Sequence, residues 1–120
     1  LVKGFDPKHV GVFTDPGHLS ICGEPIELAL NIVKDYMSLL AFKDLMRQAV
    51  IQGGKTTWRT KVVRLGHGFG DWTTLLTTLK GMKFDGVVSF HSEYSGEPVD
   101  TVIDLARADV RFINNLLKEL

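Results

Sequence analysis

Five residues of this chain carry side chains that transfer protons, bind anions or hold metals in proteins. They are Asp15, His18, Lys43, His91 and Glu93. Each lies at or just beyond the end of a short apolar run, which is the pattern of a buried strand. The carboxyl ends of parallel strands meet at one face of an α/β fold, where active sites form. We therefore expect these side chains to converge.

Three apolar runs predict the strands that would position them. The runs extend from Val10 to Phe13, from Met37 to Phe42 and from Val87 to Phe90. The second run is almost continuously apolar, as expected for a parallel strand covered on both faces.

Helical patterns alternate with these runs. Pro25 suits the first turn of one helix, and Asp71 and Gly81 suit the N-cap and the C-terminal stop of a second. Pro98 opens a third helix, whose apolar periodicity continues to the end of the chain. Strands alternating with helices predict an α/β domain with a parallel sheet.

The segment from Asp44 to Gly66 lacks a helical pattern. Gly53-Gly54 separates two strand-like stretches, Ala49 to Ile51 and Thr57 to Val63, which predicts a β-hairpin. Two interpretations are open. The hairpin is either a surface element with Trp58 packed on its neighbour or a lid over a substrate.

Composition is that of an ordinary globular domain and excludes some functions. Hydrophobic residues make up 44% of the chain, and 14 basic residues balance 14 acidic ones. A nucleic-acid-binding domain usually carries a basic excess, so we expect no nucleic-acid partner. No apolar run reaches the roughly 18 residues of a membrane helix, so we expect no membrane partner and a cytoplasmic protein. Cys22, the single cysteine, is interpreted as a small apolar residue.

Each candidate also has a purely structural explanation. Asp15, followed by Pro and Gly, is typical of a turn, and His18 can be an ordinary loop imidazole. Lys43 either contacts substrate or pairs with Asp44 or Asp15. His67 lies between two glycines, from which it could close on a ligand or simply reach solvent.

Alternation along the last strand groups three polar residues. Ser89, His91 and Glu93 are two residues apart and therefore point to the same side of the strand. If that side faces the interior of a barrel, the three side chains converge there. If that side faces the helices, the assignment of this strand is wrong.

The order of these motifs resembles the C-terminal part of sugar isomerases and epimerases with the xylose-isomerase-like barrel. The segments that carry the resemblance are Asp15-Pro16-Gly17-His18, Phe42-Lys43-Asp44, Leu65-Gly66-His67-Gly68 with Asp71-Trp72, and Phe84-Asp85-Gly86 running into Ser89-Phe90-His91-Ser92-Glu93. The resemblance covers the chain from about Val10 onward and implies the last three βα units of a TIM (β/α)8 barrel.

A complete barrel needs eight such units and about 250 residues. We therefore expect residues 1–120 to be a partial barrel domain, inactive alone, which needs the rest of the barrel or a homo-oligomer.

The resemblance also implies a function. A sugar or sugar phosphate would be isomerised or epimerised by proton transfer between adjacent carbons, assisted by a divalent metal such as Mn, Mg, Co or Zn. Asp15 matches the metal-binding aspartate of the family, and His18 matches the histidine that faces the substrate. Lys43, His91 and Glu93 become catalytic candidates, and His67 a substrate-binding one.

Three departures from the family pattern keep an alternative open. Ala41 stands where many members have a histidine, His91 where many have a glutamate, and His67 where a glutamate is common. The alternative is a catalytically silent barrel that binds carbohydrate. A DNA-repair endonuclease of the related barrel type ranks third, because it needs a multi-metal cluster and a basic groove.

Overall fold

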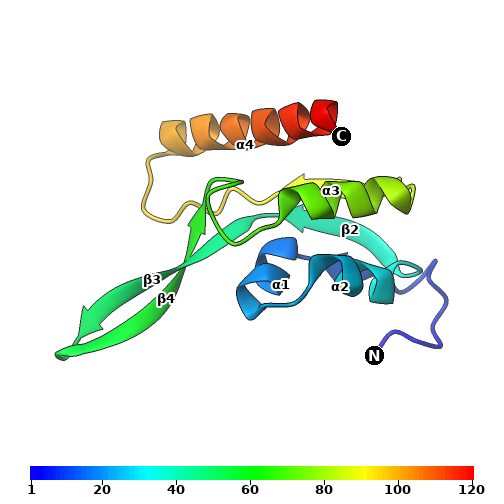
Figure 1. The fold of residues 1–120 in the computed structure, drawn as a ribbon, viewed down its shortest axis with the longest axis horizontal. Coiled ribbons are helices and arrows are strands. Elements are labelled where there is room, and N and C mark those ends of the chain that lie inside the picture. Colours follow the sequence, from blue (N-terminus) through cyan, green and yellow to red (C-terminus); the bar gives the residue numbers. More distant parts are fainter.

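A computed structural model describes all 120 residues of the chain, and Figure 1 shows its fold. The elements in chain order are β1 (Val12–Thr14), α1 (Pro16–Cys22), α2 (Ile26–Val33), β2 (Met37–Phe42), β3 (Asp44–Gln52), β4 (Lys55–Val63), α3 (Trp72–Gly81), β5 (Val87–Phe90) and α4 (Val99–Glu119). The strands form two sheets: a parallel sheet in the order β1-β2-β5 and the antiparallel pair β3-β4.

The parallel sheet confirms the predicted α/β class. β2 lies in the centre, where its Leu40 is paired in register with Thr14 of β1 and Val88 of β5. The boundaries of β2 and β5 are those predicted. β1 is shorter than predicted, because it begins at Val12 rather than Val10.

The hydrophobic core lies between this sheet and the helices. Leu40 and Phe42 of β2 enter it from the sheet, and α3 supplies four buried residues along one helical face. The buried core residues are Ile26, Leu30, Leu40, Phe42, Leu65, Trp72, Leu75, Leu76, Leu79 and Ile113. Because side chains alternate along a strand, Ala41 and Lys43 point to the opposite face of the sheet.

Helix α1 is an element that sequence reasoning missed. It begins directly after β1, where Asp15 is its N-cap and accepts a hydrogen bond from the backbone N–H of His18 at 3.1 Å. Gly23, with a φ of 79°, ends it in the left-handed conformation. The helix has seven residues, too few for an apolar periodicity to stand out.

The other predicted helices are present. Pro25 is the N-cap of α2, and Pro98 is that of α4. Asp71 caps α3 by accepting from the backbone N–H of Thr74 at 3.0 Å, and Gly81 is the last residue of that helix. None of the helices combines the length and the apolar composition needed to cross a membrane.

The predicted hairpin is also confirmed, and it projects away from the parallel sheet (Figure 1). Its strands are longer than predicted and join at Gly53-Gly54, both with positive φ, as a tight two-residue hairpin turn requires. Trp58 is paired in register with Ala49 and is 66% exposed, so most of its surface is open to solvent. Whether its ring packs on a neighbouring side chain, as one interpretation expects, stays a prediction.

Candidate active site

Polar residues gather on the face of the parallel sheet that points away from the helices. Phe42 and Phe90 are paired in register and pack against each other on the helix side, with ring centroids 5.7 Å apart. The next residues, Lys43 and His91, therefore point to the other face. The backbone N–H of His91 continues the ladder by donating to the carbonyl of Phe42 at 3.0 Å.

Lys43 lies at the centre of this cluster. Its Nζ is 3.1 Å from Oδ2 of Asp15 and 3.1 Å from Oε2 of Glu93. Only 8% of its side chain is exposed. Burial lowers the pKa of Lys43, but hydrogen bonds to Asp15 and Glu93 and the charges of both carboxylates outweigh burial and raise it above the ordinary lysine value. The side chain is therefore a permanent ammonium group at neutral pH.

Two imidazoles extend the cluster at its ends. Nδ1 of His91 is 3.4 Å from Oε1 of Glu93, and the His91 ring packs edge-on against Phe13 of β1 at a centroid distance of 5.7 Å. Nε2 of His18 is 3.6 Å from Oδ2 of Asp15, and the His18 side chain is 60% exposed. The order of contacts is thus His18, Asp15, Lys43, Glu93, His91.

The structure does not bring His67 into this cluster. His67 is exposed in the loop before α3 and lines a neighbouring cavity of about 510 Å³. Lys61 and Arg64 line the same cavity, as do Glu93 and Tyr94. Glu93 is therefore the residue that belongs to both the cluster and the cavity.

Asp44 is an important residue whose role sequence reasoning missed. It is fully buried, and its carboxylate accepts hydrogen bonds from the indole N–H of Trp72 and from four backbone N–H groups. The four backbone donors belong to Leu45, Gly66, Gly68 and Gly70, at 2.9–3.0 Å. Asp44 thereby ties the end of β2 to the loop that carries His67 and to the start of α3.

Gly68 of that loop is required by the close approach of Asp44. A Cβ atom on Gly68 would lie 2.3 Å from Oδ1 of Asp44 and 2.5 Å from the carbonyl oxygen of Leu45. The spacing Gly66-x-Gly68-x-Gly70 is the sequence signal that could have revealed this arrangement, because it offers a bare backbone at every second residue.

A second buried carboxylate, Asp109, holds the segment that follows β5. It accepts from the backbone N–H of Leu65 at 3.0 Å and from the hydroxyl of Tyr94, the residue next to Glu93. Burial and then the hydrogen bond to Asp109 raise the pKa of Tyr94, so the phenol stays a donor. Asp109 precedes the buried Ile113 of α4 by four residues and therefore lies on the same face of the helix. A carboxylate on that apolar face is the sequence signal that could have revealed a buried Asp109.

The donors of these 120 residues do not form a metal site by themselves. No three His, Cys, Asp or Glu side chains lie close enough together to hold one ion. Oδ2 of Asp15, the predicted ligand, is already paired with the Lys43 ammonium. Ala41, two residues before Lys43 on the same strand face, presents only a methyl group. The role of Asp15 as a metal ligand stays a prediction.

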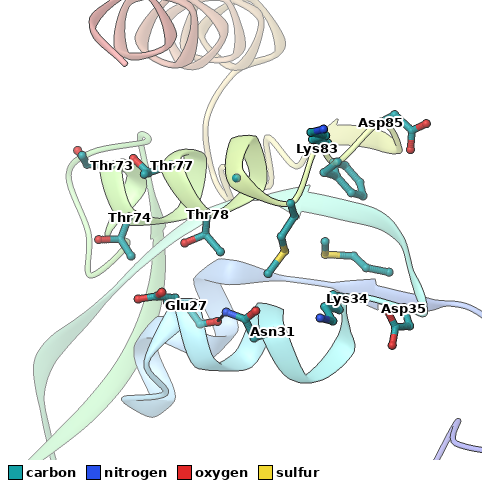
Figure 2. A pocket seen from close by; sticks show the side chains of 14 residues that line it. Glu27, Asn31, Lys34, Asp35, Thr73, Thr74, Thr77, Thr78, Lys83 and Asp85 are labelled. Atoms are coloured by element: carbon teal, nitrogen blue, oxygen red, sulfur yellow. Dashed lines mark hydrogen bonds between the residues drawn. The ribbon is translucent and has the colours of Figure 1, made fainter.

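A second cavity, of about 910 Å³, lies elsewhere. Figure 2 shows it between α2 and α3, where Glu27 and Asn31 of α2 face Thr74 and Thr78 of α3. None of the strand-end residues described above lines it. The groove therefore belongs to the outer helix layer and is separate from the candidate active site.

Comparison with known proteins identifies the family. The family described as xylose isomerase-like TIM barrel matches residues 1–116. The crystal structure of a xylose isomerase domain protein from Planctomyces limnophilus superimposes with a TM-score of 0.72 and 29% sequence identity. The match covers 98% of this chain but only 41% of that protein. No curated protein matches the chain. With its parallel strands and outer helices, the chain belongs to the xylose isomerase-like TIM barrel family, and it corresponds to part of such a barrel.

Proposed function

We propose that the protein containing this chain isomerises or epimerises a sugar or sugar phosphate by moving a proton between adjacent carbons. The observation that carries the proposal is the unbroken series of contacts His18, Asp15, Lys43, Glu93, His91 across the ends of three parallel strands. Family membership supports it, because this family includes sugar isomerases and epimerases. The chain spans less than half of its structural neighbour, so the activity is that of the whole protein.

Glu93 and His91 are the proposed proton-transfer pair. Their side chains are 3.4 Å apart, so a proton taken from a substrate carbon by one can be shared with the other. Glu93 also lines the 510 Å³ cavity, which is large enough for a small sugar. His67, which lines that cavity, and the exposed His18 are the proposed substrate-binding residues.

Lys43 has a different role in this proposal. Proton removal next to a carbonyl places negative charge on the carbonyl oxygen, and a fixed ammonium group nearby stabilises that charge. The carboxylates of Asp15 and Glu93 hold the ammonium in place. Asp15 thus positions Lys43.

The divalent metal that the resemblance implies would need ligands beyond these residues. Asp15 is the residue that would hold it, and a metal would polarise the sugar oxygens. The chain supplies too few free donors for such a site. The proposed reaction therefore uses Glu93, His91 and Lys43.

The experiment is solvent-deuterium exchange into sugars. The purified protein is incubated in D₂O with a panel of aldoses, ketoses and their phosphates, and deuterium beside the carbonyl is detected by NMR. Glu93→Gln, which keeps the size of the side chain and removes the base, is expected to slow exchange by about 100-fold or more. Glu119→Gln, an exposed glutamate of α4 that does not line the cavity, is the matched control and should exchange at the wild-type rate. Equal rates in the two variants would remove Glu93 from the reaction.

A silent carbohydrate-binding barrel is the second candidate. Phe13 favours it, since its ring is 54% exposed beside His91 and offers an apolar face to a sugar ring. Saturable sugar binding by calorimetry without any deuterium exchange would support this candidate over the isomerase.

A further inference from the structure

The four carboxylate oxygens of Asp15 and Glu93 are all engaged within the chain. Oδ1 of Asp15 accepts from the backbone N–H of His18, and Oδ2 faces the ammonium of Lys43. Oε2 of Glu93 faces the same ammonium, and Oε1 faces the imidazole of His91. A metal ion requires ligand oxygens whose free lone pairs point at one shared position. The atom at that position is Nζ of Lys43.

The surroundings of Lys43 hold it there. The side chain is almost fully buried at the end of β2, and Phe42 and Asp44 on either side point into the packed layer between sheet and helices. Displacing the ammonium would leave it without partners in a largely desolvated position, which is costly. A divalent ion placed beside it would instead be repelled by a fixed positive charge.

We infer that the Lys43 ammonium supplies the positive charge of this site in place of a divalent cation, and that its remaining N–H binds a carbonyl or hydroxyl oxygen of the substrate. An ammonium group has three donors, and the two carboxylates engage two of them. That the bound oxygen belongs to a sugar rests on the proposed function. That Lys43 takes the place of a divalent cation does not depend on the proposed function.

A lysine can serve a carbonyl-binding site in two ways, as a nucleophile or as a fixed positive charge. A lysine that forms a covalent adduct with a carbonyl must turn a free Nζ lone pair toward that carbon, whereas Nζ of Lys43 faces two carboxylate oxygens at 3.1 Å. Lys43 therefore acts as a fixed positive charge and as a hydrogen-bond donor. On this inference, the substrate binds without a chelatable metal ion in the site.

The test uses Mn²⁺ as the probe, on the protein containing this chain at its natural length. Lysine is labelled with ¹³C at Cε, and the Lys43 signal is assigned by its loss in Lys43→Met. Paramagnetic Mn²⁺ within a few ångströms would broaden that signal beyond detection. We expect Mn²⁺ to broaden the Lys43 signal no more than the signal of Lys34, an exposed lysine that serves as the control.

Selective loss of the Lys43 signal on adding Mn²⁺, restored by Asp15→Asn, would overturn the inference. Elemental mass spectrometry of protein purified without chelators gives a second readout. We expect no stoichiometric divalent ion, whereas about one ion per chain that disappears in Asp15→Asn would also overturn it. Neither readout depends on turnover, so failure of the proposed isomerase activity would leave this result interpretable.

Discussion

Lys43 and Asp44 are neighbours in sequence, both buried and both charged, yet the chain uses them in opposite ways. Asp44 points into the packed layer, where its partners are four backbone N–H groups and the Trp72 indole. Lys43 points to the open face of the sheet, where its partners are the side chains of Asp15 and Glu93.

The difference separates a structural charge from a functional one. The Asp44 carboxylate is saturated by four backbone N–H groups and the buried Trp72 indole, so its role is to hold the loop between Leu65 and Asp71. The partners of Lys43 are partly exposed, with 56% of the Glu93 side chain accessible, so a ligand can reach them. A rigid support beneath an accessible polar cluster is what a precise binding site requires.

The largest effect should come from Asp44→Ala. It leaves several buried donors without an acceptor, and we expect a loss of more than about 3 kcal/mol in the free energy of unfolding. Urea denaturation measures it. Asp71→Ala, which removes only the exposed N-cap of α3, should cost about 1 kcal/mol. If the two variants lose similar amounts of unfolding free energy, the buried Asp44 carboxylate stabilises the fold no more than an ordinary N-cap does.

His91→Ala should affect activity rather than stability, because His91 belongs to the polar cluster around Lys43. It removes one partner of the proposed proton-transfer pair, and we expect deuterium exchange into the sugar to fall about 100-fold with little change in stability. Ser92→Ala, one residue along the strand direction, should leave exchange within about twofold of wild type. If both variants lose the same activity, the face of β5 that we assign to the site is the wrong one.

Substitutions at two glycines test whether the loop before α3 must pack closely against Asp44. Gly68→Ala drives a methyl group into the Asp44 carboxylate, and we expect it to destabilise the fold by about 2 kcal/mol. Gly81→Ala, at the end of α3 with open space around it, should stabilise the fold by roughly 0.5–1 kcal/mol. Thermal melting of both variants tests the pair, and a neutral Gly68→Ala would mean that the loop does not need its close contact with Asp44.

The smallest effect is a dependence on pH. Because the folded pKa of Lys43 is raised, its stabilisation is fully present below the unfolded pKa of about 10.4 and is lost as the pH rises through the higher folded pKa. The stability difference between wild type and Lys43→Met, about 1 kcal/mol, should stay constant from about pH 7 to 10 and shrink above that range. Lys34→Met is the control. A difference that already shrinks between about pH 7 and 9 would show that burial lowers this pKa instead.

Local patterns were sufficient for much of the fold. The apolar runs of β2 and β5, the caps Asp71 and Pro98 and the Gly53-Gly54 turn are each readable within a few residues. Helix α1 was not readable in this way, since it is short and its N-cap Asp15 was interpreted only as a turn or site residue. Strand alternation correctly grouped His91 with Glu93, because that pattern is local too.

The pairing of charges was decided by tertiary structure. Lys43 meets Glu93 from 50 residues away because parallel register aligns the ends of β2 and β5, and no short-range pattern contains that register. The same holds for Asp44, whose donors lie 22 to 28 residues further along the chain apart from its own neighbour Leu45. The sequence by itself determined which residue types stand at the strand ends and which faces they share. Only the packed sheet decided that Lys43 pairs with Asp15 rather than Asp44 and that Glu93 joins them, because alignment of distant segments depends on the whole core.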